Sequence, residues 1–131
     1  MKYPVVAFLT FGLLGLAVGA QAADDCDANQ ASMNECAGKT FKKADDDLNK
    51  YYKIQMDYLK TPASRDALKD AQRKWLAFRD ADCLYQTGKP ADGGSMWPMV
   101  NLQCKTALTQ QRVAQLKAYT ECRSEYDQCP N

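Results

Sequence analysis

The 131-residue chain contains no histidine, which removes the commonest general base and the commonest nitrogen ligand for metals. It also has no CxxC motif, and its cysteine spacings are too long or irregular for a zinc site. Glutamate occurs only at positions 35, 121 and 125, and no carboxylate pair shares the apolar setting expected of a glycosidase. We therefore expect no catalytic residue, no metal and no cofactor, and a protein that is not an enzyme.

An excess of charge of one sign is also missing. Lys and Arg number 17 and Asp and Glu number 16, and the one long apolar run covers residues 5–20. This run follows Lys2 and precedes Ala20-Gln21-Ala22, the pattern of a secretory signal peptide at residues 1–22. It is too short and poorly flanked for a spanning helix. We expect a bacterial protein, periplasmic or secreted, with no membrane anchor after cleavage and no nucleic-acid partner.

The mature chain, residues 23–131, is expected to form a single domain that contains all of the cysteines. An even number of cysteines behind an export signal indicates disulfide bonds. Six cysteines allow about 15 pairings, and the sequence does not choose among them. Our expectation is the local set, which joins Cys26 to Cys36, Cys83 to Cys104, and Cys122 to Cys129.

Apolar residues recur at steps of three and four along most of the mature chain, which predicts helices and no strands. Ser32 and Glu35 fit a capping box at the start of the first helix. The short turn at 61–63 predicts that the first two helices are antiparallel neighbours. We expect an all-α fold, a small antiparallel bundle that is stapled by disulfides. Its three main helices are predicted at residues 32–60, 64–85 and 98–119, followed by a polar tail at 118–131.

The run AQRKWLAFRDADC at residues 71–83 combines aromatic, charged and cysteine residues in one helical segment. One interpretation is a charged site beside an aromatic platform. The one we favour is structural, with Arg79 paired to Asp45 or Asp46 of the first helix and packed on Trp75. Polar neighbours then complete a buried network around Arg79 or Arg112. The residues predicted to be structural are Asp45, Asn49, Trp75, Phe78, Arg79, Asp80, Thr109 and Arg112.

Glycine and proline punctuate residues 88–95, which predicts a loop between the second and third helices. Held at its base, such a loop can enter the cleft of a partner. The alternative is a simple turn, with Trp97 covering the end of the core. The candidate partner-binding residues are Lys89, Asp92, Gly93, Gly94, Ser95, Met96 and Trp97.

The order of these features resembles the LprI-type lysozyme-inhibitor domain of bacterial secreted proteins. The resemblance covers about residues 26–117, and its most specific part is the run at 71–83. The four cysteines of the family correspond to Cys26, Cys36, Cys83 and Cys104, whereas Cys122 and Cys129 lie outside its pattern.

The resemblance implies a lysozyme inhibitor that blocks a muramidase cleft by non-covalent binding. We expect the loop to supply the contact. Acids such as Asp80, Asp82 and Asp92 are expected to steer association with a basic c-type lysozyme. The alternative is a periplasmic scaffold or binding module for another envelope protein, with no role toward lysozyme.

Overall fold

The computed structural model describes residues 25–122 and residue 129, and these are helical almost throughout. The long helices are α1 (Gln30–Tyr58), α2 (Pro62–Thr87) and α4 (Trp97–Glu121). Two short elements, α3 (Pro90–Gly93) and the 3-10 turn η1 (Gly94–Met96), connect α2 to α4. The prediction of an all-α, disulfide-stapled fold is confirmed. The predicted signal peptide and most of the predicted tail beyond residue 122 lie outside the described residues.

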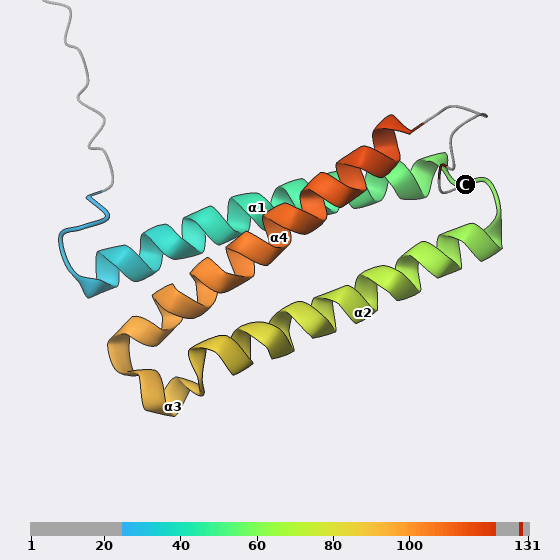
Figure 1. The fold of residues 1–131 in the computed structure, drawn as a ribbon. Coiled ribbons are helices and arrows are strands. Elements are labelled where there is room, and N and C mark those ends of the chain that lie inside the picture. Colours follow the sequence, from blue (N-terminus) through green and yellow to red (C-terminus); the bar gives the residue numbers. More distant parts are fainter. Residues whose placement is uncertain (1–24, 123–128, 130–131) are drawn as a thin grey trace, which may run out of the picture.

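The chain reverses direction at two corners, so that α2 runs antiparallel to α1 and to α4 (Figure 1). Helix α4 packs along α1 and also against α2, whereas the backbones of α1 and α2 make little close contact in the described part of the chain. The predicted antiparallel arrangement of α1 and α2 is therefore confirmed, but the two helices meet through side chains, such as those of Asp45 and Arg79, and not through close backbone packing. Small buried side chains, Ala37 and Ala44 on α1 and Thr106 and Thr109 on α4, let those two helices approach closely.

The first helix begins earlier than predicted. Asn29 is its N-cap, and the side chain of Asn29 accepts a hydrogen bond from the backbone N–H of Ser32 at 3.0 Å. Asn is as good an N-cap as Ser, and it stands three residues closer to the N-terminus. The predicted capping box is thus wrong, and Glu35 instead forms an exposed ion pair with Lys39 at 3.0 Å.

The predicted loop after α2 is a compact corner. Gly88 and Gly94 have φ values of 73° and 55°, a left-handed conformation that favours glycine, and between them Pro90 begins a single helical turn. Gly93 lies against Trp97, and a Cβ added at Gly93 would come within 2.7 Å of the Cβ of Trp97. The prediction of an irregular loop is therefore corrected to two short helical elements.

The interior is small and unusually polar. Its buried apolar residues are Ala37, Ala44, Leu48, Leu59, Cys83 and Leu116. Its buried polar residues are Gln55, Gln72, Arg79, Asn101, Thr106, Thr109 and Arg112. Within the described residues, every buried side-chain nitrogen and oxygen atom has a hydrogen-bond partner. Because an unsatisfied buried polar atom is costly, this complete pairing is what allows so polar an interior.

The disulfides join Cys26 to Cys36, Cys83 to Cys104, and Cys122 to Cys129, the local pairs expected from the sequence. The Cys83–Cys104 bond links the last turns of α2 to α4, and so it closes the segment that contains the corner. The Cys26–Cys36 bond holds the residues before α1 against the start of that helix.

Candidate functional site

Arg79 is the centre of the predicted ion-pair network and is buried between the three long helices. Its Nη1 atom lies 3.7 Å from Oδ1 of Asp45 on α1 and donates a hydrogen bond to Oγ1 of Thr109 on α4 at 3.3 Å. Its Nε atom donates to Oδ1 of Asp80 at 3.0 Å. The guanidinium thus connects all three long helices, and of the two predicted acids the structure selects Asp45.

Trp75 stands between two buried arginines. The guanidinium carbon of Arg79 lies 5.4 Å from the centroid of the Trp75 ring, and that of Arg112 lies 6.0 Å from it. Nε of Arg112 donates to Oε1 of Gln72 at 3.1 Å. Cation–π contacts of this kind gain strength when the cation is desolvated. The run at 71–83 therefore holds the helices together.

Two predicted members of the network lie elsewhere. Asn49 is exposed and donates to Oδ2 of Asp45 at 3.2 Å, so it orients the carboxylate that faces Arg79 and does not bond an arginine directly. Phe78, predicted as core, is 56% exposed. The prediction for Phe78 is wrong because Gln72, Arg79 and Cys83 define the buried face of α2, and Phe78 lies on the opposite side of the helix.

Sequence reasoning missed two residues of the network. Gln72 is buried and pairs with Arg112, and the ring of Phe41 lies 5.3 Å from the guanidinium of Arg79. A signal for Gln72 was present, because it stands one heptad before Arg79 and so shares its helix face. Nothing distinguished Phe41 from the other apolar residues of α1.

Asp80 is the described carboxylate with a displaced pKa. Partial burial opposes its ionisation, but the hydrogen bond and charge of Arg79, together with Lys105 at 3.3 Å, outweigh that effect and lower the pKa of Asp80. Because the folded-state pKa lies below the unfolded value, the folded state binds fewer protons across that interval.

We expect the ion pair of Asp80 with Arg79 to stabilise the fold. Its contribution is complete above the unfolded-state pKa of about 3.9 and is lost as the pH falls through the lower folded-state pKa of Asp80. Asp80 is half exposed, so the contribution should stay below about 1 kcal/mol. Thermal melts of wild type and Asp80→Asn at a series of pH values test this. The two Tm values should differ at neutral pH and converge in acid. Asp66→Asn, at an exposed carboxylate of the same helix, is the control, and an equal convergence there would contradict the assignment.

The corner between α2 and α4 is fixed at several points. Nε1 of Trp97 donates to the backbone oxygen of Gly88 at 2.8 Å, and Nδ2 of Asn101 donates to Oγ1 of Thr87 at 3.0 Å. The side chain of Asn34 donates to the backbone oxygen of Ser95 at 3.0 Å, which attaches the corner to α1. The predicted partner-binding residues therefore sit on a braced surface, with Trp97 half-buried as its anchor and residues 89–96 exposed.

Exposed apolar side chains gather at this end of the molecule. Of the six large apolar residues exposed in the described part of the chain, four lie beside the corner: Leu84, Tyr85, Met96 and Val100. The end is also acidic. Residues 25–36 and 82–100, here called the acidic tip, contain five carboxylates and a single cation, Lys89. An apolar patch rimmed by one sign of charge is typical of a protein-binding surface.

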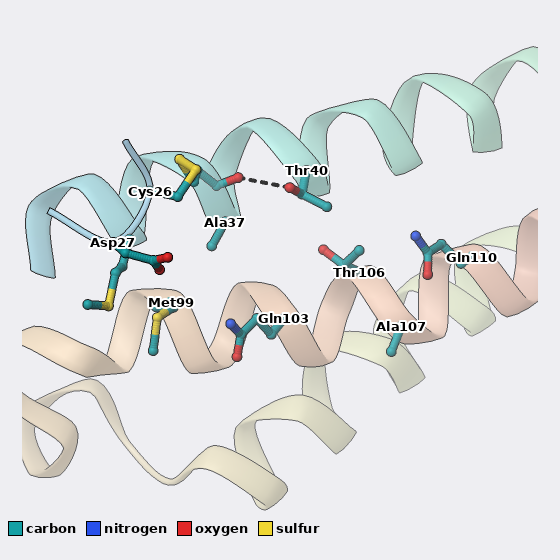
Figure 2. A pocket seen from close by; sticks show the side chains of 11 residues that line it. Cys26, Asp27, Ala37, Thr40, Met99, Gln103, Thr106, Ala107 and Gln110 are labelled. Atoms are coloured by element: carbon teal, nitrogen blue, oxygen red, sulfur yellow. Dashed lines mark hydrogen bonds between the residues drawn. A yellow bond between two sulfur atoms is a disulfide. The ribbon is translucent and has the colours of Figure 1, made fainter. Parts of the chain in front are cut away.

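A groove of about 390 Å³ runs between α1 and α4, beginning at the acidic tip. Figure 2 shows Met99, Gln103 and Thr106 of α4 on one side and Ala37 and Thr40 of α1 on the other. The Cys26–Cys36 disulfide lines the groove near the start of α1, and Oγ1 of Thr40 donates to the backbone oxygen of Cys36 at 2.9 Å. Its lining is apolar or neutral apart from Asp27, so it offers mainly uncharged contact area.

The part of the chain that the structure describes contains no cluster of three metal-binding side chains. Within the same part, no helix is both long and apolar enough to cross a membrane.

Comparison of the sequence with known proteins identifies a family. The sequence model of the family described as "Lysozyme inhibitor LprI" matches residues 21–116, which include α1, α2, the corner and most of α4. The chain belongs to the LprI family. An uncharacterized protein of Rhizobium meliloti (strain 1021) is 34% identical over 115 residues, covering 77% of this chain and 82% of that protein. No solved structure matches the chain. The LprI family is described by inhibition, and not by a reaction that its members catalyse.

Proposed function

We propose that this protein is an exported inhibitor of lysozyme that acts by non-covalent binding, without chemical turnover. The observation that carries the proposal is the LprI family match, which covers residues 21–116 and so includes α1, α2 and most of α4. The three disulfides suit an oxidising compartment outside the cytoplasm, where a lysozyme would be met.

The acidic tip is the contact surface that we propose. C-type lysozymes are basic, and the tip carries five carboxylates against one cation, so long-range attraction favours the encounter. Met96, 53% exposed, and Tyr85, 87% exposed, stand beside the corner and supply apolar contact area. A corner held by Trp97 loses little conformational freedom on binding, which strengthens association.

The same surface suits the cleft of a muramidase. Such a cleft contains two carboxyl groups, which accept hydrogen bonds from donors such as the ammonium of Lys89 or the hydroxyl of Ser95. Both residues are exposed at the corner. Occupying the cleft would exclude the polysaccharide without any bond being made or broken.

We expect the mature protein to slow the lysis of bacterial cell walls by a c-type lysozyme at micromolar concentration, measured by turbidity. Met96→Glu should weaken inhibition about tenfold or more, which corresponds to about 1.4 kcal/mol of binding free energy. Ile54→Glu is the matched control, because Ile54 is 41% exposed on α1 far from the corner, and it should inhibit like wild type.

A panel of c-, g- and i-type lysozymes decides the proposal. If none is slowed at a large molar excess of inhibitor, the protein is not a lysozyme inhibitor. If a lysozyme is inhibited equally by wild type and Met96→Glu, inhibition stands and the acidic tip is not the contact surface.

A further inference from the structure

The solvent-facing side of α2 is not explained by the packing of the fold, and of its residues only Tyr85 also belongs to the acidic tip. Helix α2 is covered on the side of Gln72, Arg79 and Cys83, and its opposite side is exposed. We call this opposite side the outer face of α2. It is formed by Ala67, Ala71, Lys74, Phe78, Ala81 and Tyr85, all of which are exposed.

The outer face has the spacing of a helix-pairing seam. Its residues follow one another at steps of four, three, four, three and four. Alternating steps of four and three mark the a and d positions of a coiled coil. Phe78 is 56% and Tyr85 is 87% exposed, so two aromatic rings stand in water along this seam. The one charged residue in the seam is Lys74, which pairs with Asp70 at 2.7 Å within the same helix.

We propose that the outer face of α2 binds the same face of a second copy of this chain, with the two helices antiparallel about a two-fold axis level with residue 76. In this register, Ala67 opposes Tyr85 of the second copy, Ala71 opposes Ala81, and Lys74 opposes Phe78. Each aromatic ring therefore meets a small or flexible side chain instead of another ring. The ammonium of Lys74 lies where it can contact the Phe78 ring of the second copy.

The second copy fits this face better than an unrelated partner because the face is self-complementary. A two-fold interface requires that residue i meet residue j and that j meet i, and the three pairings above satisfy this. Charge favours the same antiparallel arrangement. The N-terminal half of α2, residues 62–76, carries four cations and two carboxylates.

The C-terminal half of α2, residues 77–87, carries Arg79, Asp80 and Asp82. Arg79 pairs with Asp80 within this half, so Asp82 leaves it with a net negative charge. Antiparallel pairing places the cationic half of each helix beside the acidic half of the other, whereas parallel pairing would place like charges together. One helix pair of this length buries a modest area, so the dimer should dissociate on dilution.

Sedimentation velocity of the mature protein over a wide concentration range tests the proposal. Wild type should shift from the monomer to the dimer mass as concentration rises. Ala81→Glu should weaken this association at least tenfold, because it places a carboxylate in the seam. Ala114→Glu, at an exposed alanine of α4, is the matched control and should associate like wild type. Circular dichroism should report unchanged helix content in each variant.

A charge pair then tests the register. The double variant Ala71→Lys with Ala81→Glu should recover the association that Ala81→Glu loses, because each lysine opposes a glutamate of the second copy only when the helices are antiparallel. Failure to recover would overturn the register. A wild type that stays monomeric at every concentration would overturn the dimer, and loss of lysozyme inhibition by Ala81→Glu in that monomer would assign the face to lysozyme instead.

Discussion

Arg79→Ala should lower the free energy of unfolding by about 3 kcal/mol, since removing one partner of a buried ion pair strands the others. Arg79 is 7% exposed and contacts Asp45, Asp80 and Thr109. The loss lies near the lower end for such pairs, because Asp45 and Asp80 reach solvent and Lys105 still faces Asp80. The Tm should fall by about 12 °C or more, at about 4 °C for each kcal/mol.

Thermal and denaturant unfolding, followed by circular dichroism, measure this loss. Arg73→Ala is the matched control, since Arg73 lies on the same helix and is exposed, and its effect should stay within about 0.5 kcal/mol. Arg79→Lys should remain strongly destabilised, because an ammonium cannot reproduce the planar donors that reach two helices at once. A loss below about 1 kcal/mol in Arg79→Ala would show that the three-helix contact of Arg79 is not a main source of stability.

The Arg79 network shows which parts of the fold could be predicted from the sequence and which could not. The partner helix and the pair of candidate acids, Asp45 and Asp46, followed from one consideration, that a partly buried arginine needs a carboxylate. The contact with Trp75 followed from the packing of the arginine stem, and the choice of Asp45 came only from the structure. The prediction that Phe78 is buried was wrong, because it assumed that the most apolar residues of α2 face inward. In α2 the inward face is set by Gln72, Arg79 and Cys83, and their burial depends on partners from α1 and α4 that periodicity within one helix does not reveal.

The packing of α4 was harder to predict for a related reason. Four of its five buried residues are polar, namely Asn101, Thr106, Thr109 and Arg112, so its inward side carries almost no apolar stripe. Its central position follows from the small side chains that line α1, and closeness of approach is a property of two facing surfaces. Steps of three and four located the helix but did not establish which neighbour it packs against.

The sequence predicted which residues form the candidate contact surface, but it did not predict their conformation. Glycine and proline located the corner, yet its two short helical elements depend on Gly93 touching Trp97 and on Asn34 reaching Ser95 from α1. The clustering of exposed apolar residues there joins the ends of α2 and α4, which only the folded chain brings together.

Removing the Cys83–Cys104 disulfide as the double variant Cys83→Ala with Cys104→Ala should cost about 3 kcal/mol in the chain-entropy account of a loop of this length. The bond spans 21 residues, and Cys83 is fully buried. The Cys26–Cys36 bond closes a shorter loop of 10 residues, so in this account its removal should cost nearly as much. The free energy of unfolding therefore distinguishes the two variants poorly, whereas the local order of the corner should distinguish them well.

Hydrogen exchange measured at residues 88–97 supplies that separation. Without Cys83–Cys104, the corner is held to the two helices by hydrogen bonds such as those of Trp97 and Asn101, and its amides should exchange at least tenfold faster. Without Cys26–Cys36, Asn34 is still held in α1, so its hydrogen bond to Ser95 of η1 should keep those amides protected. Lysozyme inhibition should follow the exchange rates, falling in the first variant and persisting in the second. Equal protection of the corner in both variants would mean that its hydrogen bonds suffice and that the disulfide contributes to stability alone.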